Sequence, residues 1–190
     1  MRVVIAGASG FIGRALCERL RGDYESVVLS RNAEPAAKPL AGAPRVATWD
    51  GRTLGDWIRD VEGAAAVVNL AGENVASGRW TTSKKERILQ SRIGCTRALV
   101  EAIKRVDNKP AVMIQASAIG YYGPRADEML DEGSQAGSGF LSEVCRESEG
   151  TGREVEALGV RYVAIHTGVV LGAGGGALAR MVQPFRLYLG

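Results

Sequence analysis

The sequence predicts a doubly wound α/β fold, in which a parallel β-sheet is covered by helices on both faces. Apolar runs of strand length alternate with helix-length amphipathic segments six times along the 190 residues. The apolar runs lack the alternation of a half-exposed strand, which indicates a sheet buried on both faces. Because crossovers between parallel strands are right-handed, we expect the strand order 3-2-1-4-5-6, with a ligand at the carboxyl ends of the strands.

The first segment combines a strand, a glycine-rich turn and a helix. Val3–Ala6 is an apolar strand, and Ile12, Leu16 and Leu20 fall four residues apart on one face of the following helix. Such a turn suits anion binding, since the backbone can approach a pyrophosphate and the helix N-terminus offers free N–H groups. The candidate pyrophosphate-binding residues are Gly7, Ser9, Gly10, Phe11, Ile12 and Gly13.

Each small residue of this turn has an expected task. Gly7 permits the tight turn, Gly10 lets the backbone approach the pyrophosphate, and Gly13 lets the helix pack close to the strand. Ser9 can add a hydroxyl donor to phosphate. The alternative interpretation is a purely structural strand–helix turn.

Composition argues against several classes of function. The net charge of +3 includes no basic block, which argues against nucleic acid, and no apolar run has membrane-spanning length. A strand directly at the N-terminus leaves no room for a signal peptide, so we expect a cytoplasmic protein.

Cys17, Cys95 and Cys145 are widely spaced and indicate reduced thiols. With His166 as the single histidine and no cysteine pair at ligand spacing, no metal site is expected.

The other elements continue the alternation, and residues 1–171 are expected to form the nucleotide-binding domain. Further strands are expected at 26–31, 45–50, 64–70, 111–117 and 162–167, the last with an extension through 169–171. Helices are expected at 54–61, 83–105, 140–158 and 177–188, and loops at 32–44, 73–80 and 118–139. Residues 172–190 would begin a substrate-binding segment.

The end of the second strand indicates which dinucleotide binds. An acidic residue there would bind the ribose 2′-hydroxyl of NAD, whereas a basic residue would accept the 2′-phosphate of NADP. The sequence has Ser30 and Arg31 at this place, and an arginine fork can bind phosphate while a serine adds a hydroxyl. We therefore expect NADP(H), with a solvated arginine at a strand end as the alternative.

The glycine spacing resembles a known superfamily. GxxGxxG over residues 7–13 is similar to the short-chain dehydrogenases/reductases, and Gly-Phe-Ile-Gly resembles their extended, sugar-nucleotide epimerase branch. The resemblance implies a Rossmann-type fold and an adenine contact for Asp50, which by itself could equally cap the following turn. Leu70, Ala71 and Gly72 resemble the small-residue motif that runs beside the nicotinamide ribose; the alternative is a strand that simply ends at a glycine.

The fifth predicted strand ends at the candidate catalytic hydroxyls. The resemblance implies a catalytic Ser or Thr at this strand end, followed by Tyr-Gly. Tyr122 matches that tyrosine, whereas the usual serine position aligns on Ala118, and Ser117, one residue earlier, is the hydroxyl at the strand end. Ser117 would hold the substrate oxygen, and Tyr121 or Tyr122 would transfer the proton, with a pKa lowered by the cofactor charge. As an alternative, both tyrosines could be packing residues.

The superfamily's proton-transfer pair, YxxxK, is missing from the next predicted helix, which reads Phe-Leu-Ser-Glu-Val-Cys-Arg over residues 140–146. With this departure, the whole chain resembles an atypical group of epimerase/dehydratase-like proteins. The motifs that carry the resemblance include Asn-Leu-Ala-Gly-Glu-Asn at 69–74 and Thr-Gly-Val-Val-Leu-Gly at 167–172. His166 and Arg92 depart from the pattern, since an Arg and an Asn are usual at these positions.

The resemblance implies an NADP-dependent oxidoreductase or epimerase that exchanges hydride with a carbinol or carbonyl carbon. Its substrate would be a small molecule, with nucleotide sugars as candidates. The alternative is a non-catalytic NADPH-binding regulatory module, which the missing YxxxK pair favours. Members of the group continue beyond this length, so we expect slow turnover at an open site. The last helix should expose an apolar patch or pack in a homo-oligomer.

Overall fold

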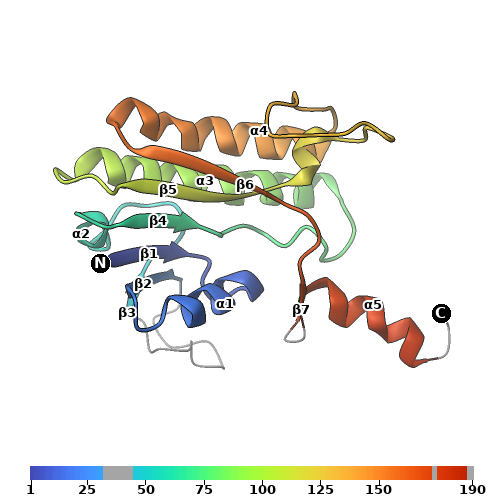
Figure 1. Cartoon of the computed structure of the whole chain (residues 1–190), viewed down its shortest axis with the longest axis horizontal. Helices are drawn as coiled ribbons and strands as arrows, with labels where there is room; N and C mark the ends of the chain where they lie inside the picture. Colours follow the sequence, from blue (N-terminus) through green and yellow to red (C-terminus); the bar gives the residue numbers. More distant parts are fainter. Residues whose placement is uncertain (32–44, 173–174, 188–190) are drawn as a thin grey trace.

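A six-stranded parallel sheet forms the centre of the protein (Figure 1). The computed structural model describes residues 1–31, 45–172 and 175–187. The sheet order is β3-β2-β1-β4-β5-β6, which confirms the prediction. The strands are β1 (Arg2–Ala6), β2 (Glu25–Ser30), β3 (Arg45–Thr48), β4 (Ala66–Asn69), β5 (Val112–Ala118) and β6 (Arg161–Thr167).

Helices cover both faces of this sheet, as predicted. One face packs against α1, and the other packs against α2, α3 and α4. The helices are α1 (Phe11–Leu20), α2 (Ile58–Val61), α3 (Thr82–Arg105), α4 (Phe140–Arg153) and α5 (Gly176–Arg186), with 3-10 turns η1 (Ile119–Tyr122) and η2 (Glu154–Leu158).

The two halves of the core use alternate residues of the same strands. Val3 and Ile5 of β1 pack toward Cys17 of α1, whereas Val4 faces the cluster that contains Leu99 of α3. Because both faces of each central strand are buried, the strands need apolar residues at consecutive positions. This is the physical reason for the unbroken apolar runs in the sequence.

The predicted apolar face of α3 is confirmed, but that of α1 is confirmed only in part. Leu16 and Leu20 pack against the core, while Ile12 is 40% exposed. Ile12 lies in the first turn of α1, at the carboxyl edge of the sheet, where the strands beneath the helix end. The α3 residues predicted to be buried are buried: Ile88, Cys95, Leu99 and Ile103.

Several predicted boundaries are wrong. The helix expected at 54–61 is reduced to α2, since Gly55 disfavours an earlier start. The helix expected at 140–158 tightens into η2 after Arg153, following two glycines, and the region expected as loop 118–139 opens with η1. The expected loop 32–44 lies outside the described residues.

The strand β6 does not extend through residues 169–171. Its last residue, Thr167, pairs with Ala118 of β5, and no neighbouring strand continues beyond that point because β5 turns into η1. Leu171 and Gly172 instead form β7 (Leu171–Gly172), which pairs antiparallel with Gly175 and Gly176. The chain thereby leaves the sheet and enters α5.

The last described helix lies away from the sheet (Figure 1). Met181, Phe185 and Leu187 expose more than half of their surface. An exposed apolar patch at this helix was one of the two expected outcomes. Assembly of a homo-oligomer through the helix stays a prediction.

The part of the chain that the structure describes was also searched for membrane and metal features. No helix within it has both the length and the apolar character needed to cross a bilayer. No group of three His, Cys, Asp or Glu side chains within it could hold a metal ion. Cys17, Cys95 and Cys145 are free thiols.

We predict that Gly13→Ala lowers the free energy of unfolding by about 1–3 kcal/mol, because its Cβ would overpack the turn before α1. That Cβ would lie 2.5 Å from the Ala8 Cα and 2.6 Å from the Gly7 carbonyl oxygen. Gly150, also inside a helix, has open space around its Cβ position, so Gly150→Ala should raise stability by about 0.5–1 kcal/mol. Urea unfolding measures both; a neutral Gly13→Ala would contradict the close packing of α1.

Candidate functional site

The glycine-rich turn lies against the end of β4. Gly7 has a φ of 82°, and a Cβ there would lie 2.6 Å from the Leu70 carbonyl carbon and 2.8 Å from the Ala71 nitrogen. Only a glycine fits this contact, because the backbone conformation disfavours a side chain and the space is already filled. The turn therefore brings two predicted stretches, residues 7–13 and 70–72, to the same edge of the sheet.

The N-terminus of α1 is open to a ligand. Gly10 is the N-cap of α1 and gives the helix no side-chain cap. A Cβ at Gly10 would meet only the Gly7 carbonyl oxygen, at 3.2 Å, so the position is less crowded than Gly7 or Gly13. The first N–H groups of the helix and the positive end of its dipole are thus suited to an anion.

The side chain of Phe11 faces the other end of the chain. A Cβ on Gly172 would lie 2.6 Å from the Phe11 ring, and one on Gly176 would lie 3.0 Å from it. Phe11 was predicted to bind cofactor. Its ring packs against the glycine segment around β7, so its contribution to anion binding would come from its backbone N–H.

Asp50 caps the turn that follows β3. Its carboxylate accepts hydrogen bonds from the backbone N–H groups of Arg52 and Thr53, at 2.8 and 2.7 Å, and from the Thr53 hydroxyl. The backbone bond from Thr53 is the main cause that lowers the pKa of Asp50. The structure thus shows the capping role that the sequence left open, and the adenine contact stays a prediction.

Basic residues gather beyond the end of β2. Arg31 directly follows β2 and is exposed. Burial raises the pKa of the Cys95 thiol to about 11, and the positive charges of Arg31 and Arg52 oppose this rise. An exposed arginine directly beyond a strand end suits a phosphate group.

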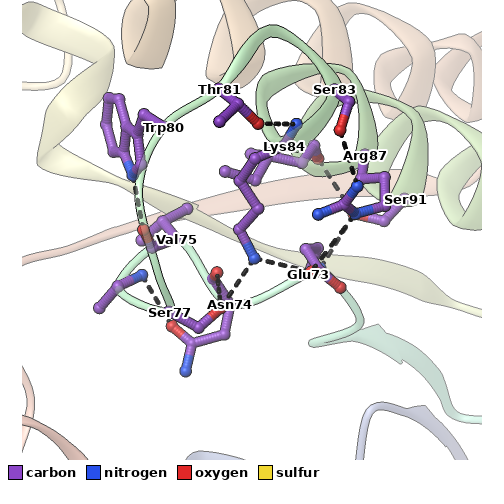
Figure 2. Close-up of polar contacts among 12 residues, drawn as sticks. Glu73, Asn74, Val75, Ser77, Trp80, Thr81, Ser83, Lys84, Arg87 and Ser91 are labelled. Atoms are coloured by element: carbon purple, nitrogen blue, oxygen red, sulfur yellow. Dashed lines mark hydrogen bonds and ion pairs between the residues drawn. The ribbon is translucent and has the colours of Figure 1, made fainter.

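The loop after β4 is fixed to α3 by a buried lysine. Figure 2 shows Lys84 pointing from α3 toward Glu73 and Ser77 of the loop, and its Nζ donates to both at 2.7 Å. Lys84 is only 5% exposed. The hydrogen bond from Lys84 is the main cause that lowers the pKa of Glu73, and Arg87 adds to it. The loop therefore keeps a defined position beside the strand ends.

Arg92 fills the space beside Gly72. Its guanidinium donates to the backbone carbonyls of Glu73 and Ile88, at 3.1 and 3.2 Å. A Cβ on Gly72 would lie 2.9 Å from the guanidinium carbon, so a side chain there would displace the end of Arg92. Burial lowers the pKa of Arg92. Gly72 thus leaves the space that the Arg92 guanidinium fills.

A buried polar network lies under the ends of β4 and β5. Asn69 donates to the Thr96 hydroxyl at 3.1 Å, and Gln115 donates to the Ser148 hydroxyl at 2.7 Å. The Thr96 hydroxyl also donates to the side-chain amide oxygen of Gln115 at 3.4 Å. The network joins β4, α3, β5 and α4, and it gives buried polar groups the partners that they require.

The candidate catalytic hydroxyls are linked through two other side chains. Ser117 at the end of β5 donates to Oε1 of Glu149 on α4. The same Oε1 lies 3.0 Å from Nε2 of His166 on β6, and His166 Nδ1 lies 2.9 Å from the Tyr122 hydroxyl on η1. The structure thus brings Ser117 and Tyr122 into one hydrogen-bonded chain.

The two tyrosines differ in their surroundings. Tyr122 is buried, and burial is the main cause that raises its pKa, with Glu132 and Tyr121 adding to the effect. The expected lowering of the pKa by a cofactor charge concerns the cofactor-bound protein and stays a prediction. Tyr121 is partly exposed, and its ring stacks on His166 at a centroid distance of 4.8 Å.

Glu149 and His166 were not predicted as site residues. The sequence carried one signal for His166, its departure from the arginine that usually precedes Thr-Gly-Val-Val-Leu-Gly. Glu149 lies four residues after Cys145, on the same face of α4, but an isolated glutamate in a helix is normally solvated. Only the packing of α4 over β5 and β6 reveals that Glu149 is buried against both.

Comparisons with known proteins point to one family. Residues 3–143 match the model of the NAD dependent epimerase/dehydratase family. The chain is 40% identical over 195 residues to the "Epimerase family protein SDR39U1 homolog, chloroplastic" of Arabidopsis thaliana, covering 100% of this chain and 55% of that protein. It is 39% identical over 189 residues to the Epimerase family protein Mb2239 of Mycobacterium bovis, covering 99% of this chain and 60% of that protein.

Solved structures agree with this assignment. The human epimerase family protein SDR39U1 (isoform 2), crystallised with NADPH, superposes with a TM-score of 0.82 at 33% identity, over 100% of this chain and 61% of that one. A nucleoside-diphosphate sugar epimerase from Corynebacterium glutamicum superposes with a TM-score of 0.79 at 35% identity, over 97% of this chain and 37% of that one. The chain thus spans little more than half the length of the curated relatives described above.

We predict that Glu73→Gln lowers the free energy of unfolding by about 1–2 kcal/mol, because buried Lys84 would lose its carboxylate partner. The pKa of Glu73 is lowered in the folded protein, so its contribution is present above the ordinary glutamate value of 4.5 and is lost as the pH falls through the lowered folded value. The difference between wild type and Glu73→Gln, measured by urea unfolding, should therefore shrink at acid pH.

Lys84→Met provides the matched variant for this pair. The double variant Glu73→Gln/Lys84→Met should be less destabilised than the sum of the two single variants, because neither charge is then left alone. Strict additivity, or a difference that does not depend on pH, would show that the ion pair does not hold the loop.

Proposed function

This chain belongs to the NAD dependent epimerase/dehydratase family, and from that premise we propose that it binds NADP(H) at the carboxyl edge of its sheet. Its proposed reaction is hydride exchange with a carbinol or carbonyl carbon of a small molecule. The observation that carries the proposal is the glycine turn packed on the end of β4, with the open N-terminus of α1 beside it.

The residues at the sheet edge fit a dinucleotide. Gly10 and the first N–H groups of α1 would hold the pyrophosphate, with Ser9 as a further donor. Phe11, Ile12 and Gly13 supply backbone N–H groups of that first turn. The nicotinamide ribose would lie along Leu70, Ala71 and Gly72, where Gly7 holds the two backbones in contact. The adenine side would be bounded by Asp50.

The choice of NADP(H) over NAD(H) rests on the end of β2. Arg31 is exposed there, and Ser30 precedes it. An arginine fork suits a 2′-phosphate, and no acidic residue stands at the position that would bind a 2′-hydroxyl. The NADPH in the human relative supports the same choice.

The catalytic roles proposed for this chain fall to the hydroxyls at the ends of β5 and η1. When bound, the nicotinamide supplies the hydride donor or acceptor. Ser117 would hold the substrate oxygen, and Tyr121 or Tyr122 would transfer its proton. Nucleotide sugars are the candidate substrates, which the name of the Corynebacterium relative supports. The cytoplasmic location stays a prediction.

A non-catalytic NADPH-binding regulatory module is the second candidate. The observation that favours it is the start of α4, where Phe140, Leu141, Val144 and Cys145 occupy the positions expected for the YxxxK pair. Cys145 instead contacts the Ala118 carbonyl, at 3.9 Å, and burial raises the pKa of its thiol. In such a module, cofactor occupancy rather than turnover would set the binding of a partner.

For cofactor choice, we predict that the protein binds NADPH more tightly than NADH and that Arg31→Asp reverses the preference. Loss of charged hydrogen bonds to the 2′-phosphate should cost about 1.5–3 kcal/mol of NADPH binding. Calorimetry with each dinucleotide measures both constants. Arg105→Asp, which makes the same charge change at the far end of α3, should leave the preference unchanged; equal constants in wild type would contradict the assignment.

For catalysis, we predict NADPH oxidation with at least one member of a panel of aldehydes, ketones and nucleotide sugars. Ser117→Ala should lower kcat by about 10²-fold, since it removes a group that holds the reacting oxygen, and should leave the Kd for NADPH unchanged. Thr151→Ala is the control, because that hydroxyl bonds the Glu147 carbonyl within α4. NADPH binding without turnover on the whole panel would favour the regulatory module.

A further inference from the structure

The hydrogen-bonded chain Ser117–Glu149–His166–Tyr122 connects four separate elements, β5, α4, β6 and η1. Its two inner members are shielded from water, with 8% of the Glu149 side chain and 19% of the His166 side chain exposed. Both ends of the chain are hydroxyls at the carboxyl edge of the sheet. An arrangement of this kind can pass a proton between the reacting edge and an interior base.

With Glu149 ionised and His166 neutral, each hydrogen bond of this chain has one direction. An ionised carboxylate only accepts, so Oε1 of Glu149 receives the Ser117 hydroxyl hydrogen and the hydrogen on His166 Nε2. A neutral imidazole with its hydrogen on Nε2 has an acceptor at Nδ1. Tyr122 must therefore donate its hydrogen to His166 Nδ1. Both hydroxyls thus donate inward and keep their lone pairs for a ligand.

We propose that Glu149 and His166 are positioning residues that provide, for the function proposed above, the proton path of the missing YxxxK pair. Glu149 fixes the His166 tautomer, and His166 holds the Tyr122 hydrogen inward. As the O–H bond of a substrate breaks, its proton moves to the Tyr122 oxygen while the Tyr122 proton moves to His166 Nδ1. The resulting imidazolium is paired with the Glu149 carboxylate, and the reverse steps return the proton to the substrate.

Several other side chains surround this hydrogen-bonded chain, and Glu149 is the carboxylate that pairs with the imidazolium. Tyr121 stacks on the His166 ring, while Glu132 and Asp131 act on Tyr122 from the loop after η1. From α4, Cys145 lies beside Ser117, and Arg92 of α3 acts on that thiol. Among the described residues, no Lys or Arg side chain hydrogen-bonds to the Tyr122 hydroxyl or to the His166 ring, whereas Arg125 donates to the Tyr122 backbone carbonyl at 3.1 Å.

Ring-¹⁵N NMR of the tag-free protein tests the arrangement without any substrate, because His166 is the single histidine. We expect the hydrogen on Nε2 and an Nδ1 shift typical of an acceptor. Tyr122→Phe should move the Nδ1 resonance, and Glu149→Gln should alter the tautomer. Tyr162→Phe on the same strand removes a hydroxyl that makes no hydrogen bond within the described residues, and it should leave both resonances in place. A hydrogen on Nδ1 in wild type would overturn the proposal.

A second experiment tests the proton transfer in the NADPH-dependent reaction. The amide of His166→Gln can donate to Glu149 and accept from Tyr122 but cannot take up a proton, so kcat should fall by about 10²-fold with the Kd for NADPH unchanged. In His166→Ala, added imidazole should restore part of the turnover, which a merely structural role would not allow.

The outcomes separate the two proposals. Full turnover in His166→Gln would overturn the proton path and leave the proposed function intact. A wild-type protein that binds NADPH and shows the expected tautomer, yet turns over nothing on the panel, would refute the proposed function and the proton path with it. Failure to bind NADPH at all would refute the proposed function, whereas the NMR test of the hydrogen-bond directions would still decide whether Glu149 and His166 hold the Tyr122 hydrogen, because it needs no cofactor.

Discussion

The contact between Gly7 and the end of β4 is the constraint on which the rest of the structure depends. The Gly7 backbone lies so close to Leu70 and Ala71 that any side chain would overlap them. This approach places the turn before α1 directly beside the loop that follows β4. It also brings the carboxyl ends of two central strands together at the point where the strand order changes direction, which is where doubly wound sheets bind ligands.

Two kinds of packing hold the edge around this contact. Apolar side chains on both faces of β1 and β4 fix the positions of the strands, whereas polar side chains fix the segments beyond them. Lys84 holds the loop after β4 through Glu73, and the network through Thr96 and Gln115 joins α3, β5 and α4. A buried polar group without a hydrogen-bond partner destabilises the folded protein. These networks therefore position the carboxyl edge of the sheet more specifically than apolar contacts alone.

The polar packing around α4 also gives Ser117 and Tyr122 hydrogen-bond partners that the sequence did not predict. Ser117 and Tyr122 lie on different elements, yet both contact a pair of titratable side chains under α4. An enzyme of this architecture needs a proton path as well as a cofactor site, and the chain lacks the usual pair for it. The hydrogen-bonded Glu149–His166 pair lies beside these hydroxyls and has the acceptor that a proton path requires.

Much of the fold followed from local patterns in the sequence. Consecutive apolar residues such as Val3, Val4 and Ile5 already indicate a strand buried on both faces, and the period of Ile88, Cys95, Leu99 and Ile103 indicates a helix. These signals are local, because the secondary structure sets which neighbours a side chain can reach. The glycines of the first turn and Arg31 at the end of β2 are local signals as well, since the roles predicted for them depend on their position next to a predicted element.

Tertiary structure decided which polar side chains meet. Glu149 and His166 are seventeen residues apart on different elements, and no periodicity connects them to Ser117 or Tyr122. The ends of elements also depended on partners, as β6 stops where β5 turns away and Ile12 is exposed where the strands end. The sequence by itself determined the order of the elements and the glycine turn, because these rest on backbone conformation and burial pattern. Only the packing of α4 over β5 and β6 determined the hydrogen-bonded chain, because hydrogen bonds between distant residues depend on distances that the folded chain alone defines.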